Sequence, residues 1–324
     1  MSTHTTPWVP VLLASLVLAA CGGGGGGSSP PPDSLLRANT DTLALAVSGK
    51  ARDVTLTNAA SKPLDGLRIH AGALPAGTTV SSTCGASLAG GASCTLTVTP
   101  GATALPAPGD AQSRPPLLVV TASGSAPLNI GVRVIAHGSV YQGGHVFSID
   151  DSTPASVGIG GKVLGLSDLG PAPWSPVADD IAGTGPTATV GTNSCDGALD
   201  GACDTALIVA HHGTQPTPYA AALCNDSQAA GFDDWYLPAV CELFPNADGI
   251  AACGTPGQPV PADNVYSRLY GNGNVAGLST TQVYSSATQA SSANAYGVAY
   301  GQDNWGTAGK GTNSLVRCAR TLTP

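Results

Sequence analysis

Residues 231–243, GFDDWYLPAVCEL, concentrate features that occur only singly elsewhere in this 324-residue chain. Gly231 can end a helix in the left-handed conformation, and Pro238 suits the first turn of the next helix. Between them lies a bulky apolar run, in which we expect Trp235 and Leu237 to be buried. The stretch therefore predicts a helix end, a buried aromatic crossover and a helix start, with Glu242 in the starting turn.

Further elements are predicted on both sides of this stretch. Before it, we expect one clear helix over residues 215–231, and after it a short helix over residues 238–244 that Pro245 stops. The run DTALIVA, which precedes His211, has the apolar character of a strand. Other strands are expected in four runs, at residues 140–150, 282–286, 295–301 and 314–320.

The composition limits the class of protein. Only 10% of the residues are charged, whereas the chain has 43 glycines and 26 prolines, so short elements and turns should dominate. With 42% apolar residues the chain can still bury a core. Its length fits about two domains. Residues 138–324 carry five basic and fifteen acidic side chains, a balance that argues against nucleic-acid binding.

The beginning of the chain has the pattern of an export segment. Residues 9–20, VPVLLASLVLAA, are apolar but too few to span a bilayer as an ordinary helix. Their end, LAAC, resembles the lipobox of bacterial lipoproteins, which implies a signal peptide over residues 1–20 and lipidation of Cys21. Because no Lys or Arg precedes the apolar run, a plain signal peptide is the alternative.

The residues after Cys21 predict a tether over residues 21–39. Six glycines and two serines form a flexible coil, and three prolines then stiffen it. Under the lipoprotein resemblance, Gly22 implies sorting to the outer membrane. We therefore expect an outer membrane-anchored lipoprotein, on the periplasmic face or at the cell surface, whose partners include the membrane itself through the lipid.

Residues 40–137 have the sequence pattern of an all-β domain. Seven short runs alternate apolar and polar residues, which predicts an antiparallel sandwich with strands at 42–47, 53–58, 67–71, 79–82, 94–99, 117–122 and 128–136. The segments VTLTNAASKPLDGLRI, LPAGTTV and CGASLAGGASCTLTVTP resemble the immunoglobulin-like modules of bacterial surface proteins. The resemblance implies an immunoglobulin-like sandwich, which we expect to act as a spacer rather than as an adhesive module.

Eight cysteines follow Cys21, which in an oxidising compartment suggests four disulfides. Cys84 and Cys94 flank a glycine-rich turn and are expected to pair. The remaining six allow 15 pairings. Short loops favour Cys195 with Cys203 and Cys241 with Cys253, while Cys224 with Cys241 is a rival pairing.

Residues 138–324 carry a second resemblance. The segments VYQGGHVFSID, DTALIVA, GFDDWYLPAVCEL, VYSSAT, AYGVAYGQDNW and LVRCAR resemble, in this order, the C-terminal domain family of the Legionella collagen-like adhesin. That family implies an α+β, C-type-lectin-like domain, distantly similar to formylglycine-generating enzymes, and it includes an adhesin for sulfated glycosaminoglycans. The lectin-like resemblance also implies a disulfide between Cys224 and Cys318.

Candidate ligand-binding residues lie near the end of the chain. Asp303-Asn304-Trp305 is similar to the sugar-binding loops of C-type lectins, although the order of residues differs, and it predicts mainly a turn with an aromatic wall. Tyr284 stands where the family has a Tyr-Trp-Ser-Ser segment. We therefore take Tyr284, Asp303, Asn304 and Trp305 as candidate ligand contacts, and expect the ligand to meet loops within residues 179–203 and 266–305.

Metal binding is not expected. His211 and His212 would point to opposite sides of a strand, which makes them a poor chelate unless the chain turns at Gly213. The acid pair Asp233-Asp234 would admit Ca²⁺, but capping and hydrogen bonding to the turn is the expected role. The sequence thus predicts no metal site and no cofactor, with Ca²⁺ as the alternative.

Motifs typical of enzymes are missing from the sequence, including GxSxG, HExxH and a P-loop. The expected function is non-catalytic recognition of a glycan or another envelope or surface partner. A sulfated polysaccharide fits poorly, since this domain carries a net charge near −10 and would repel a polyanion. A structural envelope protein is the first alternative, and an enzyme related to formylglycine-generating proteins, which needs a reactive cysteine, is the second.

Overall fold

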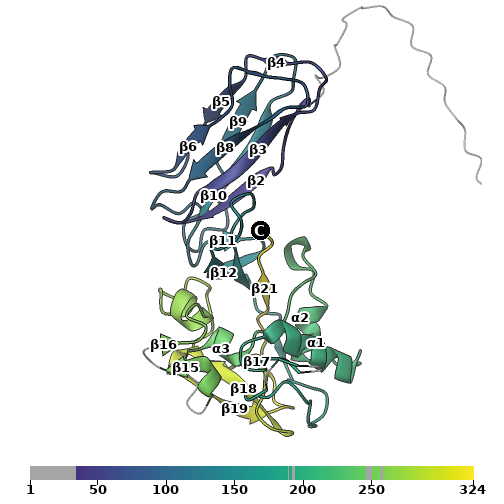
Figure 1. The fold of residues 1–324 in the computed structure, drawn as a ribbon. Helices are drawn as coiled ribbons and strands as arrows, with labels where there is room; N and C mark the ends of the chain where they lie inside the picture. Colours follow the sequence, from purple (N-terminus) through teal and green to yellow (C-terminus); the bar gives the residue numbers. More distant parts are fainter. Residues whose placement is uncertain (1–33, 189, 192–193, 246–249, 256–257) are drawn as a thin grey trace, which may run out of the picture. The chain divides into compact units, whose positions relative to one another are not determined.

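The computed structural model describes residues 34–188, 190–191, 194–245, 250–255 and 258–324. The predicted signal peptide, Cys21 and the rest of the predicted tether up to residue 33 lie outside these residues. None of the helices found in the described ranges is long and apolar enough to cross a bilayer. The chain is β-rich, with two packed sheets followed by a region of mixed helices and strands (Figure 1).

The first domain is a sandwich of two four-stranded sheets, in the orders β1-β3-β8-β6 and β2-β10-β9-β5. A two-stranded pair, β4-β7, accompanies them. All seven predicted strands are present, and β1, β4 and β7 are additional. The strands are β1 Leu36–Ala38, β2 Thr42–Ala46, β3 Arg52–Asn58, β4 Leu64–Asp65, β5 Arg68–Ala71, β6 Thr79–Ser82, β7 Ser87–Leu88, β8 Ser93–Thr99, β9 Leu117–Thr121 and β10 Leu128–Ile135.

Apolar residues at alternate positions fill the space between these sheets. Val54 and Leu56 of β3 are fully buried and pack in one core with Val120 of β9 and Val132 of β10. The expectation of a purely antiparallel sandwich is wrong at one point, because β2 and β10 are parallel. These strands are far apart in sequence, so no hairpin forces them to run in opposite directions.

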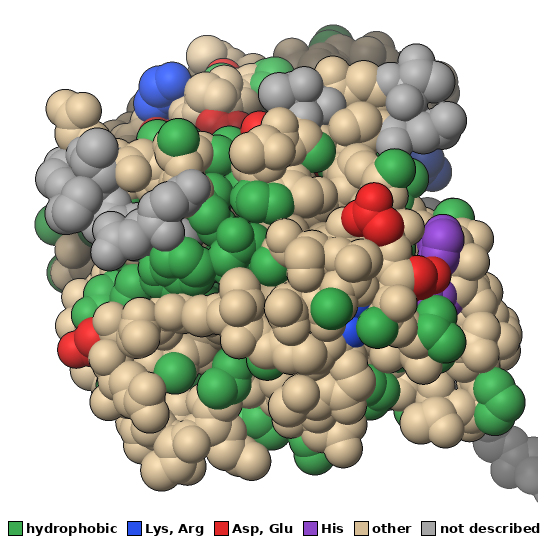
Figure 2. Space-filling view, turned by 90° about the horizontal axis from the view of Figure 1, so that it is seen from below, with side chains coloured by type: hydrophobic (Ala, Val, Ile, Leu, Met, Phe, Trp, Pro, Cys, Tyr) green, Lys and Arg blue, Asp and Glu red, His purple; other side chains and the backbone are tan. Residues whose placement is uncertain are grey.

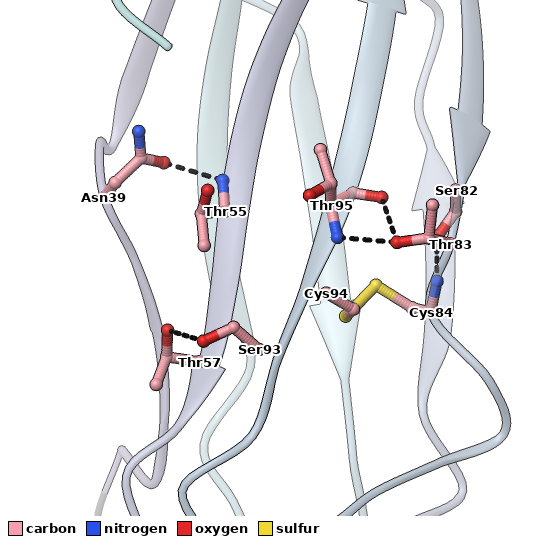
Figure 3. Close-up of a disulfide and its surroundings, with 9 residues drawn as sticks. All are labelled: Asn39, Thr55, Thr57, Ser82, Thr83, Cys84, Ser93, Cys94 and Thr95. Carbon is pink, nitrogen blue, oxygen red and sulfur yellow. Dashed lines mark hydrogen bonds between the residues drawn. A yellow bond between two sulfur atoms is a disulfide. The ribbon is translucent and has the colours of Figure 1, made fainter.

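A disulfide between Cys84 and Cys94 ties β8 to the segment after β6, as predicted (Figure 3). Beside it, the Thr95 backbone N–H donates to the Thr83 hydroxyl at 2.9 Å, and the Cys84 N–H donates to the Ser82 hydroxyl at 2.9 Å. The hydroxyl groups thus complete the backbone hydrogen bonding where the ladder between β6 and β8 ends.

The second domain contains two principal sheets, in the orders β11-β12-β13-β21 and β14-β20-β17-β18-β19, and a small pair β15-β16. The run predicted to be extended at residues 140–150 forms two strands, β11 and β12. Its strands are β11 Val140–Tyr141, β12 Gly144–Asp150, β13 Gly160–Gly165, β14 Pro171–Ala172, β15 Gly254–Thr255, β16 Gln258–Pro259, β17 Tyr284–Gln289, β18 Asn294–Ala299, β19 Asn304–Gly309, β20 Ser314–Leu315 and β21 Ala319–Thr321.

The helices differ from the prediction. The helix expected over residues 215–231 is only α2, which ends at Asn225; a separate 3₁₀ turn, η1, follows, and Ala230 within it has a non-helical φ of 56°. The described α-helices are α1 Gly201–His212, α2 Ala220–Asn225 and α3 Val240–Leu243; the shorter turns are η1 Ala229–Gly231, η2 Ala251–Cys253, the π-helical η3 Tyr266–Tyr270 and η4 Tyr300–Gln302.

The strand predicted for DTALIVA is wrong, since this run lies inside α1. Asp200 caps the helix by accepting a hydrogen bond from the Cys203 backbone N–H at 3.0 Å. The α1 helix contacts both α2 and β17, so one side of it is buried. Tertiary packing and the cap therefore override the strand preference of Thr205, Ile208 and Val209.

The stretch 231–243 joins distant parts of this domain. Trp235 and Leu237 are buried, as expected, and the backbones of Tyr236 and Ala319 exchange two hydrogen bonds of 2.8 Å. Asp234 forms an ion pair with Arg320. The Asp234 carboxylate therefore neutralises a buried guanidinium, instead of capping the turn as predicted.

Glu242 is fully buried at the start of α3. Its carboxylate accepts hydrogen bonds from the backbone N–H groups of Ala239, at 2.9 Å, and Gly201, at 3.3 Å. The Tyr236 hydroxyl donates to it at 3.0 Å, and Lys162 forms an ion pair with it. One carboxylate thus connects α1, α3 and β13, and its charge is compensated in the core.

Three further disulfides link this domain. They join Cys195 to Cys203, Cys241 to Cys253 and Cys224 to Cys318, so the rival pairing of Cys224 with Cys241 does not occur. The long link connects α2 to the segment before β21, across 94 residues. All eight cysteines of the described part of the chain are paired.

The start and the end of the second domain are in contact. The Gln142 side-chain amide donates to the Thr323 carbonyl at 2.7 Å, and the Thr323 N–H donates back to Gln142 Oε1 at 3.0 Å. The guanidinium of Arg320 also donates to Gln142 Oε1, at 2.9 Å. Gln142 therefore holds the last described residues against the turn between β11 and β12.

Candidate binding groove on the second sheet

A groove of about 180 Å³ runs over the sheet formed by β17, β18 and β19. Gly297 of β18 pairs directly with Gly306 of β19, and the neighbouring pair on the same side is Ala295 with Ala308. Because alternate residues of a strand share a face, these four small residues lie on one side of the sheet. Small side chains there leave room that larger residues would fill.

Gly306 gives this groove its width. A Cβ atom built on Gly306 would meet no other atom within 4 Å, whereas one on Gly297 would come within 2.8 Å of Val283 and 2.9 Å of the Tyr284 carbonyl. The space above β19 is therefore open, while that above β18 is closed by the neighbouring strand.

The groove is uncharged among the described residues that border it. Polar side chains at its border are the amides of Gln302 and Asn304 and the hydroxyls of Ser285, Thr312 and Ser314. The ring of Trp174 supplies aromatic surface there. Neutral donors and acceptors beside an aromatic ring suit a ligand that is itself polar but uncharged.

Two of the four candidate ligand residues border this groove, namely Asn304 and Trp305. Their ligand roles stay predictions. The indole of Trp305 contacts the Tyr296 ring, with centroids 5.4 Å apart. Both side chains alternate along their strands with Gly297 and Gly306, so they leave the sheet on the side opposite to the groove floor.

The other two candidates do not reach the groove. Tyr284 is 1% exposed, and its hydroxyl accepts from the Ser279 N–H at 2.8 Å and donates to Asp168 at 3.2 Å. Burial raises the pKa of this phenol. Asp303 has φ 48° in the turn between β18 and β19 and accepts from the Tyr266 hydroxyl at 3.1 Å. Tyr284 thus belongs to the core and Asp303 to a turn outside this groove, and the ligand roles of both stay predictions.

Sequence reasoning missed β19, and with it the groove. The run NWGTAG contains two glycines, which weaken a strand, and it lies between the strands predicted at residues 295–301 and 314–320. A signal was present, since AYGVAY and NWGTAG both place small residues at every second position. The contribution of Trp174, 110 residues before Tyr284, had no local signal.

Comparisons with known proteins give no family. Neither the family models nor the curated proteins contain a match to this chain. Among solved structures, a fimbrial protein from Bacteroides ovatus matches 84% of this chain and 76% of its own, at 11% identity and a TM-score of 0.37.

Two other solved structures are similar at a lower TM-score. The adhesin InvE of Yersinia pseudotuberculosis matches 93% of this chain and all of its own, at 15% identity and a TM-score of 0.20. The CupB2 chaperone of Pseudomonas aeruginosa matches 30% of this chain, at 14% identity and a TM-score of 0.22. The chain spans 55% of the length of that chaperone. At these TM-scores the likenesses carry no argument about function.

Proposed function

We propose that this chain is an envelope-anchored, non-catalytic protein whose second domain binds a neutral glycan in the groove over β17, β18 and β19. The observation that supports the proposal most is the lining of the groove, in which amides and hydroxyls occur together with the Trp174 ring, and in which the described residues include no charged side chain. Hydroxyl-rich, uncharged sugars are matched by such donors and acceptors.

The ligand class follows from charge as well as shape. A sulfated polysaccharide would need cationic side chains, and the groove offers none among its described residues, in a domain with a net charge near −10. The lipobox-like end of the export segment supports attachment to the outer membrane. The four disulfides are typical of a compartment outside the reducing cytosol.

The alternative of an enzyme related to formylglycine-generating proteins has less support. That chemistry requires a reactive cysteine, and the eight cysteines in the described ranges are all engaged in disulfides. Labelling of the native protein with a thiol reagent tests this alternative, and a reacting cysteine in the second domain would revive it.

A glycan array probed with the purified protein tests the proposal. We expect binding to neutral oligosaccharides that persists in a chelator, because the groove is not built from carboxylates. Gly306→Val should abolish it, since the added side chain enters the open space above β19. Gly311→Val is the matched control, because its Cβ also meets nothing within 4 Å and it does not border the groove.

Two results would overturn the proposal: no binding to any neutral glycan, or equal binding by the Gly306→Val and Gly311→Val variants. Crosslinking in the native envelope then tests for a purely structural role, in which the second domain would be crosslinked to another envelope protein. Protease added to intact cells distinguishes the cell surface, where the second domain would be removed, from the periplasmic face, where it would survive.

A further inference from the structure

Asp179, His211 and His212 come together at the end of α1. His211 Nε2 lies 2.7 Å from Asp179 Oδ2, and His212 Nε2 lies 3.7 Å from Asp179 Oδ1. One potential ligand atom from each residue lies within 4.8 Å of the other two. The imidazole rings are nearly perpendicular, with centroids 4.7 Å apart. Figure 2 shows histidine side chains, in purple, adjoining acidic side chains, in red, at one edge of the face seen there.

The helix explains why two adjacent histidines converge. In a strand their side chains would point to opposite sides, which is why no chelate was expected. Both instead lie in the last turn of α1, and Gly213, with φ 62°, ends the helix directly after them. Asp179 lies in the loop after β14 and approaches both rings.

Two atoms of this cluster are buried without a hydrogen bond. The His212 side chain is only 4% exposed, and its Nε2 has no hydrogen-bond partner among the described residues. Asp179 Oδ1, which it faces, lacks one too. A buried polar atom left unpaired costs roughly 1–3 kcal/mol, so a ligand that engages both atoms would relieve a real penalty.

The charges around the cluster favour a cation, with one opposing group. The end of α1 carries the negative end of the helix dipole, and Asp180 follows Asp179 in the chain. Against a cation stands Lys310, whose ammonium donates to the Asp179 backbone carbonyl and to Gln289 Oε1, each at 2.5 Å. Neither of these acceptors is a carboxylate oxygen of Asp179, so Lys310 leaves that carboxylate available.

The protonation states also suit metal binding. Burial lowers the pKa of His212, although the charge of Asp179 opposes this shift. For Asp179, burial raises the pKa, but the hydrogen bond from His211 and the charges of His212, His211 and Lys310 outweigh it, so the pKa lies below its ordinary value. Metals bind the neutral imidazole and the ionised carboxylate, so metal binding would displace any proton that the histidines hold beside Asp179.

We propose that Asp179, His211 and His212 bind one divalent transition-metal ion, of which Zn²⁺ is the representative. Two imidazole nitrogens and one carboxylate are a common set of three protein ligands for Zn²⁺, with a fourth position left to water or a ligand. Tetrahedral coordination at about 2.0–2.2 Å requires ligand atoms about 3.3–3.6 Å apart. The two histidine-to-carboxylate distances, 2.7 Å to Oδ2 and 3.7 Å to Oδ1, lie on either side of this spacing, and no two of the three ligand atoms are more than 4.8 Å apart. Rotation of the exposed His211 ring would bring them to it.

The proposed site lies near the groove but does not depend on it. Lys310, which contacts the Asp179 carbonyl, lies 4.4 Å from the centre of the Trp174 ring, which borders the groove. A metal ion would fix the loop that carries Asp179 to the end of α1. Glycan binding in the groove and metal binding at the cluster are therefore separate properties with separate tests.

Titration of the full chain with Zn²⁺, after treatment with chelator, tests the proposal. We expect one ion per chain by calorimetry, a rise in the melting temperature with Zn²⁺, and visible absorption bands when Co²⁺ replaces it. Asp179→Asn and His211→Gln should each weaken binding by about tenfold or more and remove the Co²⁺ bands. His211 is 42% exposed, so its variant should fold.

His70→Gln is the matched control, because His70 lies exposed on β5 of the first domain and is far from the cluster in sequence. It should bind Zn²⁺ as the unmodified protein does. The proposal is overturned if the unmodified protein binds no Zn²⁺, or if it binds equally well with Asp179 and His211 both replaced. Neither result would affect glycan binding, which the Gly306→Val variant tests.

Discussion

Asp234 holds Arg320 through two hydrogen bonds, from Nε to Oδ1 at 2.6 Å and from Nη2 to Oδ2 at 3.0 Å. The Arg320 guanidinium also lies 3.7 Å from the centre of the Phe232 ring. Planar, bidentate pairing of this kind is specific to arginine. The pair joins DWYLPAVCEL to VRCAR, the two most characteristic segments of the second domain, which are more than 80 residues apart.

Replacing Asp234 by Asn should destabilise the protein. The Arg320 side chain is 1% exposed, and it would lose its counter-charge while keeping the oxygens of Gln142. Because the Asp234 carboxylate is about half exposed, we expect the low end of the range for a charged hydrogen bond, about 1.5 kcal/mol in the free energy of unfolding. Urea unfolding measures it. The exposed neighbour provides the control, since Asp233→Asn should change stability by less than about 0.5 kcal/mol.

Glu242→Gln should cost more, about 2–3 kcal/mol. The carboxylate accepts from Ala239, Gly201 and Tyr236, and a glutamine amide has only one oxygen to offer these donors. Its NH₂ group would face another donor, and Lys162 would lose its partner. Chemical denaturation measures the loss. A change as small as that of the exposed Asp226→Asn variant would show that the buried carboxylate is not a structural link.

Asp204 should make stability depend on pH. It is fully buried, neither carboxylate oxygen has a hydrogen-bond partner among the described residues, and burial together with Asp200, Glu242 and Asp196 raises its pKa to about 10. The folded protein therefore keeps this proton when the unfolded chain, with an ordinary pKa of 3.8, has released it. The stability that protonated Asp204 contributes is fully present below about pH 4 and is lost progressively as the pH rises towards about 10.

Replacing Asp204 by Asn removes the proton that the folded and unfolded states bind differently. We expect the variant to resemble the unmodified protein near pH 4 and to be more stable near pH 8, because it no longer favours unfolding by proton release. Melting temperatures across this range measure the difference, with the exposed Asp41→Asn variant as the control. A parallel pH dependence in the Asp204→Asn variant and the unmodified protein would show that Asp204 is ionised in the fold.

The disulfides of the second domain should differ in their contributions. The link between Cys224 and Cys318 closes 94 residues, and that between Cys195 and Cys203 closes 8. In the chain-entropy model these contribute about 4.7 and about 2.5 kcal/mol. Replacing both cysteines of each pair by alanine, then unfolding in urea without reductant, compares them. Equal losses would argue that chain entropy is not the main origin of the stabilisation.

Local sequence patterns predicted much of the secondary structure and of the buried core. The seven strands of the first domain follow from alternation such as that of Val54 and Leu56, which is set by residues close in sequence. The burial of Trp235 and Leu237 and the short disulfide loops also follow from nearby residues. The link between Cys224 and Cys318 was instead implied by a resemblance to a known family.

The candidate sites depended on contacts that local patterns do not contain. Thr205, Ile208 and Val209 favoured a strand, yet the Asp200 cap and packing against β17 make the run helical, and this alone brings the two histidines together. Similarly, the side of the sheet on which Trp305 lies is set by its pairing with Val298. Such pairings join segments that fold together only in three dimensions.

The contact between Gln142 and Thr323 brings the beginning and the end of the second domain close together. Gln142 follows directly after β11, so a short peptide would be enough to join Thr323 to the residues before β11, and the domain is suited to circular permutation. New ends opened in an exposed loop, for example at the turn after β19, would leave both main sheets and all three disulfides intact. The order of these strands along the chain is thus not what determines their arrangement in the folded domain.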